Sequence, residues 1–245
     1  MHCLATQEVE VQAKWEQYKV VYEKTYKNQV EERMRKKLWL QNKDMVEQHN
    51  RLYDAGEVTY YLAQNHLSDW TEEEIERLQN FKPSQKPAAD NIYTPSGKAI
   101  PTTVDWRTKG AVNPIKDQGQ CGSCWAFSAI ASIETQYWLA TKNLKSFSEQ
   151  QLVDCVDGSS CETGGLMDRG FLYLQSNGLE TENSYPYIAK DQDCHYDASK
   201  AAMKGVKSYT DLPQGDEKAL ADAVANVGVI SIGINASRKD FTFYA

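Results

Sequence analysis

The 245-residue sequence has no long hydrophobic run, no excess of positive charge and only one cysteine before residue 121. Its apolar stretches fall well short of the roughly 18 residues that a membrane-spanning helix requires. With 27 Lys and Arg against 34 Asp and Glu, the net charge is −7, which argues against nucleic acid or an anionic membrane as the main partner. We therefore expect a soluble protein with no membrane span and no nucleic-acid partner.

The N-terminus also lacks the apolar stretch of roughly 7–15 residues that marks a signal peptide. The cysteines nevertheless indicate an oxidising compartment, because all but Cys3 lie between Cys121 and Cys194 and such clusters are typical of disulfide-bonded domains. We expect a lysosomal or secreted protein whose signal peptide is not present in this sequence. A cytosolic protein with reduced thiols is the alternative.

Residues 8 to about 80 contain no cysteine, and their pattern predicts helices. Four apolar side chains recur there at helical spacing: Val11, Trp15, Tyr18 and Tyr22. Residues 29–52 contain no Gly or Pro and predict one long helix. Thr71 and Glu74 have the spacing of a capping box, which predicts a further helix start.

Residues 82–99 predict an exposed linker. Prolines and small polar residues from Lys82 to Asp90 and from Thr94 to Gly97 disfavour helices and strand ladders, and such segments are where proteases cut. The part after about Ile100 mixes helical stretches with strand-like runs such as residues 229–234. The sequence thus predicts a helical domain at 1–81, a linker at 82–99 and a second domain at 100–245.

The most informative stretch is residues 118–128, QGQCGSCWAFS. Its glycines mark a tight loop, after which a helix is predicted to begin at Cys124. A cysteine at a helix N-terminus faces the positive end of the helix dipole, which favours the thiolate, and a thiolate can attack a peptide carbonyl. The backbone N–H of Cys124 and the side-chain amide of Gln118 are candidate donors to the oxygen of that carbonyl.

Three other interpretations of the pair Cys121 and Cys124 compete with this one: a redox dithiol, half of a zinc site, and a buried, inert cysteine. Thioredoxin-like motifs usually place Trp before the first cysteine, where Gln120 stands here. The remaining cysteines and His195 lack the usual spacing of zinc ligands, so we expect no metal site.

The stretch from Cys121 to Trp125 resembles the C-G-[SA]-C-[WY] signature of papain-family cysteine peptidases. The resemblance extends to flanking segments at residues 104–107, 110–112, 115–119, 148–155 and 182–187. It implies a cathepsin L-like cysteine endopeptidase with an α+β fold, made of a helical lobe and an incomplete β-rich lobe whose C-terminal part is expected to be missing. By this resemblance Cys124 is the nucleophile and Gln118 the oxyanion donor. The resemblance further implies protein and peptide substrates, no cofactor and a monomer.

The same resemblance implies the disulfides and the substrate cleft. Sequence alone leaves three pairings of four cysteines open, and the family pattern implies Cys121–Cys161 and Cys155–Cys194. The family's cleft, which prefers an apolar side chain at the second residue before the cut, maps onto Gly122, Trp125, Gly164, Gly165, Leu166, Met167 and Gly233. The chain departs from the family by placing Glu162-Thr163 before the glycine pair, where most relatives have Cys-Asn.

Six residues of the long predicted helix are spaced 4, 4, 3, 4 and 4 and form one stripe: Glu31, Arg35, Trp39, Asn42, Val46 and Asn50. On spacing alone, such a stripe is more often a solvated helix face. It resembles the ERFNIN pattern of papain-family propeptides, and the segment containing Asn65 and Asp69 resembles the companion motif. The resemblance implies that residues 1–81 are an I29-like prodomain that inhibits its own peptidase domain. We hypothesise that low pH releases it by protonating Asp69 or carboxylates near Glu31 and Arg35.

A cysteine peptidase also needs a histidine to form the ion pair and to protonate the leaving amine. The family places it roughly 130–150 residues after the cysteine, beyond Ala245, and an Asn further on. His195 lies in an acidic loop and is expected to be a surface residue. As written, the chain is expected not to complete a catalytic cycle. The alternative is a truncated, non-catalytic protein whose prodomain inhibits proteases in trans. Asn235-Ala236-Ser237 is a glycosylation sequon.

Overall fold

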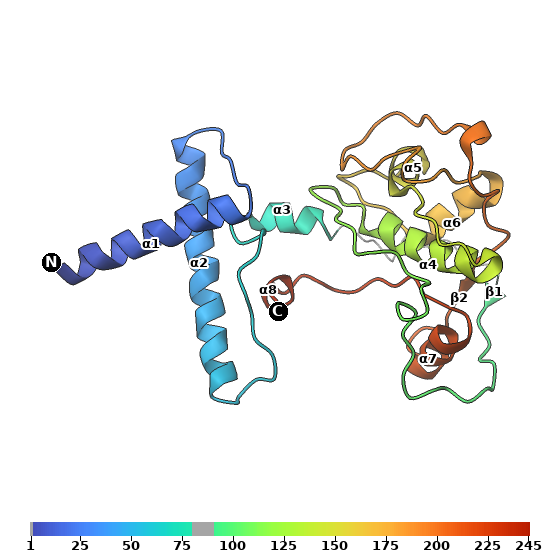
Figure 1. Cartoon of the computed structure of the whole chain (residues 1–245), viewed down its shortest axis with the longest axis horizontal. Helices are drawn as coiled ribbons and strands as arrows, with labels where there is room; N and C mark the ends of the chain where they lie inside the picture. Colours follow the sequence, from blue (N-terminus) through green and yellow to red (C-terminus); the bar gives the residue numbers. More distant parts are fainter. Residues whose placement is uncertain (1, 80–90) are drawn as a thin grey trace. The chain divides into compact units, whose positions relative to one another are not determined.

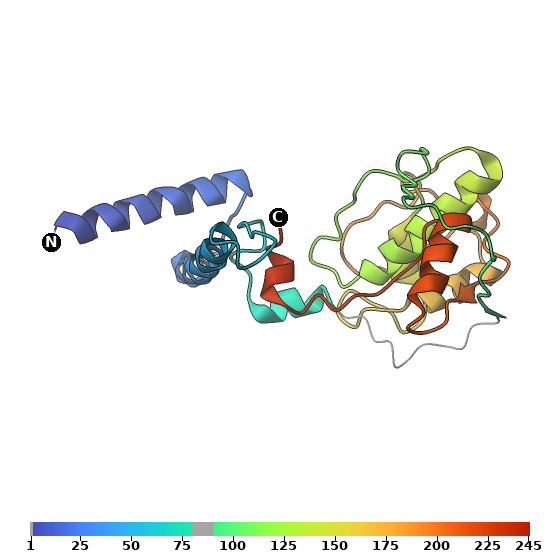
Figure 2. The same cartoon turned by 90° about the horizontal axis from the view of Figure 1, so that it is seen from below.

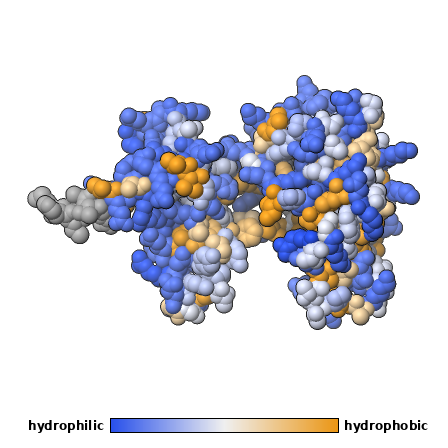
Figure 3. Space-filling view, in the orientation of Figure 1, coloured by the Kyte–Doolittle hydropathy of each residue, from blue (hydrophilic) through white to orange (hydrophobic). Residues whose placement is uncertain are grey.

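The computed structural model describes residues 2–79 and 91–245 (Figure 1). The chain forms two compact units. Unit 1 consists of Met1–Glu76 together with Asn235–Ala245, and unit 2 consists of Arg77–Ile234. Among the described residues, no helix has both the length and the apolar character needed to cross a bilayer. Apolar residues are interspersed with polar ones on the visible faces (Figure 3).

Unit 1 is helical, as the sequence predicts. Helix α1 spans His2–Val21, α2 spans Gln29–Asp54, α3 spans Glu72–Arg77 and the short α8 spans Lys239–Thr242. The side chain of Asn28 caps α2 by accepting from the N–H groups of Val30 and Glu31. The predicted capping box is confirmed: Glu74 Oε2 accepts from Thr71 N at 2.8 Å, and Thr71 Oγ1 accepts from Glu74 N at 3.2 Å.

Two apolar clusters hold unit 1 together. Helix α1 crosses α2 (Figures 1 and 2), and Trp15, Tyr18 and Trp39 are buried at the crossing. The second cluster joins Val46 of α2, Leu62 and Phe243. Phe243 comes from the C-terminal segment, so residues near both ends of the chain share one core.

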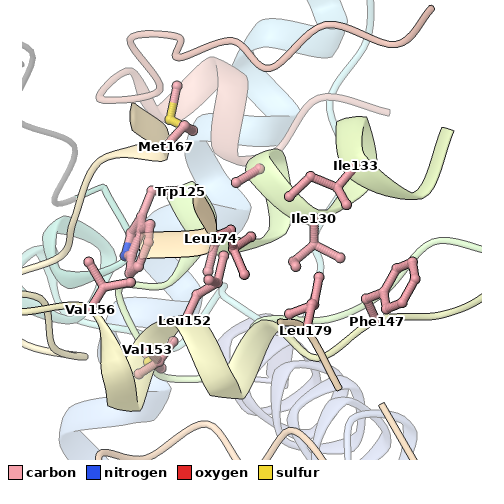
Figure 4. Packing of buried hydrophobic residues seen from close by; sticks show 13 residues of the cluster. Trp125, Ile130, Ile133, Phe147, Leu152, Val153, Val156, Met167, Leu174 and Leu179 are labelled. Atoms are coloured by element: carbon pink, nitrogen blue, oxygen red, sulfur yellow. The ribbon is translucent and has the colours of Figure 1, made fainter. Parts of the chain in front are cut away.

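Unit 2 packs three helices around one core. Helix α4 (Cys124–Thr141) contacts both α5 (Glu149–Cys155) and α6 (Met167–Ser176). Trp125 and Ile130 of α4 meet Leu152 of α5 and Leu174 of α6 in this core (Figure 4). Helix α7 (Glu217–Asn226) and the 3-10 helix Ala198–Lys200 complete the unit.

The sheet in the described part of unit 2 is small. Strand β1 (Asn91–Ile92) pairs in parallel with β2 (Thr210–Asp211), with Asn91 opposite Thr210. The prediction that residues 229–234 behave as a strand is wrong for this structure, because they join no ladder with any described residue. Ser231 and Ile232 bond instead to Ser128 of α4. A β-forming composition makes a ladder only where a partner strand lies beside it.

Most of the predicted linker, residues 82–90, lies outside the described residues, as does the boundary predicted between residues 81 and 82. Residues 94–97 are exposed, as predicted. They are nonetheless anchored, because Ser96 N and Ser96 Oγ both donate to the Asp222 carboxylate of α7 at 2.9 Å.

Candidate active site

Cys124 is the first residue of α4, as predicted, and it is half-buried. The loop before it is built by glycines and a disulfide. Gly119 has a φ of +57°, which glycine adopts without steric strain. Cys121 is bonded to Cys161, and Gly122 N donates to the Cys161 carbonyl at 2.9 Å. These contacts fix the point at which the helix begins and therefore the position of the thiol.

The two disulfides expected from the family pattern, Cys121–Cys161 and Cys155–Cys194, are confirmed. Cys121 is therefore not a dithiol partner of Cys124, and the redox interpretation of this pair is wrong. No group of three or more His, Cys, Asp or Glu in the described part of the chain is arranged to hold a metal ion.

Two opposed effects act on the pKa of the Cys124 thiol. Burial raises this pKa above its ordinary value, and the N–H groups of Trp125 and Cys124, which lower it, do not fully offset the burial. The effect expected of the helix N-terminus is present, but removing the thiol from water penalises the charged form more strongly. A cation beside Cys124 is needed to reverse this.

His195, the one histidine of unit 2, does not act as that cation. Its ring stacks on Tyr185 with a centroid separation of 3.9 Å, and its Nδ1 lies 3.1 Å from the Asp193 carbonyl. His49 contacts Tyr60 and His66 contacts Trp70, both within unit 1. The His195 ring is thus engaged with Tyr185 and Asp193, and that His195 is not catalytic stays a prediction.

Gln118 is held in the same loop as Cys124. Its Nε2 donates to the Cys121 carbonyl at 2.9 Å and lies 3.5 Å from the Leu78 carbonyl, at the limit of a hydrogen bond. The backbone carbonyl of Gln118 accepts a hydrogen bond from Tyr187 Oη at 2.7 Å. Tyr187 Oη also forms a hydrogen bond with Ser123 Oγ at 2.5 Å. Tyr187 thereby ties the residue before the thiol to Gln118.

The role of Tyr187 escaped sequence reasoning, although the residue lies in one of the segments that resemble the family. Burial raises the pKa of Tyr187 to about 12, so its hydroxyl keeps its proton and remains a donor at physiological pH. The contact joins positions 69 residues apart, and no local pattern marks it.

The structure explains why glycines stand at positions 164 and 165. A Cβ on Gly165 would come within 2.4 Å of the Trp125 indole, and Gly164 has a φ of +68°. Leu166 and Met167, expected to line the cleft, are 2% and 8% exposed. Met167 packs in the core that contains Trp125 (Figure 4). Their assignment to a substrate pocket stays a prediction.

Gly233 follows a segment that is fastened to α4 one turn after Cys124. Ser231 Oγ donates to the Ser128 carbonyl at 2.7 Å, and Ser128 Oγ exchanges hydrogen bonds with the backbone of Ile232 at 3.2 Å. Gly233 itself is exposed. The positioning role of Ser128 was missed, because a serine inside a helix carries no signal of a distant partner.

A buried ion cluster lies two residues before Gln118. Lys116 Nζ contacts Glu149 Oε1 at 2.6 Å and Glu134 Oε1 at 3.0 Å. Burial raises the pKa of Glu149 to about 7, against the opposing effect of Lys116. Glu149 Oε2 is buried without a hydrogen-bond partner among the described residues. The sequence analysis did not identify this cluster.

The stripe on α2 faces inward, so the alternative of a solvated helix face is wrong. Trp39, Asn42 and Val46 are buried. Asn42 Nδ2 donates to the Ser68 carbonyl at 2.9 Å, and Asn50 exchanges two 2.8 Å hydrogen bonds with the backbone of Leu62. The stripe thus fixes the segment that carries the companion motif.

The charged residues of the two motifs have defined partners. Arg35 donates to Glu74 Oε1 at 2.7 Å and to the Asp69 carbonyl at 3.1 Å, and it lies 3.6 Å from Glu31. The Asp69 carboxylate accepts from the hydroxyls of Tyr18 and Tyr26, each at 2.8 Å, and pairs with Lys24 at 2.9 Å. Asn65 Nδ2 donates to the Thr242 carbonyl at 2.7 Å.

Comparison with known proteins agrees with this geometry. Residues 100–245 match the model for papain family cysteine protease, and residues 15–75 match that for the cathepsin propeptide inhibitor domain (I29). A cathepsin L-like peptidase of Aedes aegypti is 42% identical over 248 residues, covering 96% of this chain and 73% of the relative. Digestive cysteine proteinase 1 of Homarus americanus is 44% identical over 237 residues, and the match covers 94% of this chain and 72% of the Homarus protein.

The similarity extends to the fold. Digestive procathepsin L 3 of Tenebrio molitor superimposes with a TM-score of 0.79 at 38% identity, covering 89% of this chain and 71% of that one. The predicted α+β, papain-like fold is therefore confirmed. The chain belongs to the papain family of cysteine proteases and is a cathepsin L-like zymogen, in which a cathepsin propeptide inhibitor domain precedes the peptidase domain.

Proposed function

We propose that Cys124 is the nucleophile of this peptidase and that Gln118 stabilises the oxyanion. The thiolate sulfur attacks the peptide carbonyl carbon, the C–N bond breaks, and the amine leaves with a proton to give a thioester that water then hydrolyses. The observation that carries the proposal is the placement of Cys124 at the start of α4, beside a loop that fixes Gln118. Donors held in advance stabilise the charge that develops on the oxygen.

The reaction needs an imidazolium beside Cys124, because burial raises the pKa of this thiol. A neighbouring cation restores the thiolate, and the same group protonates the leaving amine. The family spacing assigns this role to a histidine roughly 130–150 residues after the cysteine.

The substrate preference follows from the proposed cleft residues. Gly122, Trp125, Gly164 and Gly165 would form the wall along which a substrate backbone lies. Leu166, Met167 and Gly233 would form the pocket for the second residue before the cut. The side chains of this pocket are apolar, which favours an apolar substrate residue.

The inhibitor domain acts on its own peptidase domain, and we infer that it does so by binding the segment 235–245. Asn65 holds the Thr242 carbonyl, Leu62 bridges to Tyr244, and Phe243 is buried against Val46 and Leu62.

The pKa values restrict the acid-release hypothesis. Glu74 has its pKa lowered to about 2, chiefly by its hydrogen bond to Arg35. A lowered carboxyl pKa gives stability that is present above the unfolded-state value near 4.5 and is lost as pH falls toward 2. The Arg35–Glu74 pair therefore survives through most of the range from about pH 4 to 7 and is not the acid trigger.

We further propose a monomer delivered to a lysosomal or extracellular compartment. Two disulfides support an oxidising route.

The proposal is tested on the protein expressed from its natural transcript, assayed between pH 4 and 7 with a peptide that carries an apolar residue second before the cut. Cys124→Ala is expected to abolish hydrolysis. Gln118→Ala is expected to lower kcat by about 10²–10³-fold, the effect of losing one oxyanion donor. Gln120→Ala, an exposed glutamine in the same loop, is the matched control and should retain activity.

Three results would each contradict a part of the proposal. Hydrolysis that persists in Cys124→Ala would exclude this nucleophile. Inhibition of a cathepsin L-like protease in trans without any hydrolysis would instead favour an inhibitor. Processing that is independent of pH between about 4 and 7 would remove the acid trigger.

A further inference from the structure

The tripeptide Asn235-Ala236-Ser237 is the one Asn-x-Ser/Thr sequon in the 245 residues. It lies in the connection between Ile234, the last residue of unit 2, and α8, which begins at Lys239. Nothing in the peptidase chemistry requires this triplet. The sequon is therefore a feature that the proposed function leaves unexplained.

The structure leaves the triplet accessible. Asn235 and Ser237 are both exposed, and neither belongs to a helix or strand. An acceptor asparagine must tolerate a bulky, hydrated oligosaccharide, and an exposed, irregular connection accommodates one without unfolding the core. Neither residue contributes to the three apolar clusters that hold the described units.

The local geometry prepares the acceptor. Asn235 Oδ1 accepts from Ser237 N at 3.0 Å and from Ser237 Oγ at 2.7 Å. Asn235 Nδ2 donates to no other residue in the described part of the chain, so the nitrogen that would carry a sugar is free. This turn joins positions only two apart, and such turns form without support from tertiary structure. The chain can therefore adopt it before folding is complete.

We propose that Asn235 is an N-glycosylation site. Nδ2 forms a bond to the anomeric carbon of a lipid-diphosphate-linked oligosaccharide, the bond from that carbon to the diphosphate oxygen breaks, and the nitrogen releases one proton as the lipid diphosphate leaves. The inference rests on the proposed delivery through an oxidising secretory compartment, which the two disulfides support.

The test is expression of residues 1–245 behind a cleavable secretion signal in insect cells. Intact mass is measured before and after peptide-N-glycosidase treatment in heavy-oxygen water. The expected result is one oligosaccharide per chain, removed with conversion of Asn235 to a heavy-oxygen-labelled Asp. Ser237→Ala and Ala236→Pro should lose the modification, because both break the sequon, whereas Ser237→Thr keeps the sequon and should retain it.

The proposal is overturned if the secreted chain has both disulfides formed but Asn235 is unmodified. That result would leave the peptidase assignment unchanged. A glycan that survives in Ser237→Ala overturns it as well, because the sugar would then lie elsewhere. Failure of the peptidase proposal is detected separately, by the Cys124→Ala variant of the natural gene product.

Discussion

At the scale of single residues, the state of the Cys124 sulfur depends on two opposed effects. Burial raises the pKa of the thiol, and the N–H groups at the start of α4 lower it by a smaller amount. We expect iodoacetamide to label Cys124 in the 245-residue chain with a pH midpoint above about 8.5, the ordinary value for cysteine. The measurement is made by mass spectrometry across a pH series in a Cys3→Ser background.

In that series, Cys124→Ser should remove all labelling. A midpoint well below the ordinary value would show that a cation in these 245 residues already stabilises the thiolate. Neutral thiols react slowly because the thiolate is the nucleophile, so the same chain should label only weakly at pH 6.

Trp39 stands where the ERFNIN pattern has Phe, and its indole shows the consequence. Trp39 Nε1 is buried with no hydrogen-bond partner among the described residues. An unpaired buried donor costs about 1–3 kcal/mol. Replacing the indole with a phenyl ring removes this cost, and the gain offsets much of the hydrophobic stabilisation that is lost with the smaller ring. Trp39→Phe is therefore expected to change the free energy of unfolding of the chain by less than about 1 kcal/mol.

Trp15 provides the matched comparison, because it is equally buried in the same cluster but donates to Glu32 Oε1 at 3.3 Å. Trp15→Phe loses this partner and should destabilise the chain by roughly 1–2 kcal/mol more than Trp39→Phe. Urea unfolding followed by circular dichroism measures both variants. Equal losses would show that the unpaired N–H of Trp39 has no energetic consequence.

At the scale of elements, the Lys116 cluster links the loop that carries Gln118 to α4 and α5. Burial raises the pKa of Glu149 to about 7, from about 4.5 when exposed. Between these values the folded chain keeps a proton that the unfolded chain has released, so stability falls as pH rises through this window. The full penalty, on the order of 3 kcal/mol at 1.36 kcal/mol per pKa unit, is present above about pH 7.

Glu149→Gln removes this titration while Lys116 keeps its contact with Glu134. The melting temperature of wild type relative to Glu149→Gln is expected to fall as pH rises from about 5 to 8. Glu217→Gln, an exposed glutamate at the start of α7, should follow the wild-type pH profile. If Glu149→Gln instead keeps the wild-type slope, Glu149 is ionised throughout this range and the assignment is wrong.

At the scale of the whole molecule, the sequence predicted what local patterns encode. The helices of unit 1 followed from spacing, from the absence of Gly and Pro in residues 29–52 and from the Thr71–Glu74 capping box. The position of Cys124 at a helix start followed from its glycine-rich loop. The disulfide pairing came only from the family resemblance, because spacing left three pairings open.

What the sequence did not predict are contacts between distant positions. Tyr187 with Gln118, Ser128 with Ile232, and Lys116 with Glu149 join residues that lie far apart in the chain. Residues 229–234 show the limit most clearly, because their β-forming composition is genuine but a strand requires a partner. The strand prediction for residues 229–234 therefore failed on tertiary pairing, whereas the helices of unit 1 and the helix start at Cys124 were predicted from local patterns.

The docking of the C-terminal segment on the prodomain can be tested within unit 1. Phe243 is 2% exposed, whereas Phe241 on the preceding turn is 53% exposed. Ala63 N donates to the Phe243 carbonyl at 2.8 Å, so exchange of the Ala63 amide hydrogen reports on this contact. Phe243→Ala is expected to remove roughly 3–5 kcal/mol of packing and to speed exchange in residues 60–65.

A loss of only 1.4 kcal/mol already corresponds to a factor of about ten, so exchange of the Ala63 amide should rise at least tenfold in Phe243→Ala. Phe241→Ala removes a ring of the same size that is largely in solvent and should leave the exchange rate near that of wild type. Equal exchange in the two variants would show that the segment is not held by Phe243. The binding inferred for the prodomain would then depend on its polar contacts with this segment, such as those of Asn65 with Thr242 and of Tyr60 with Asp240.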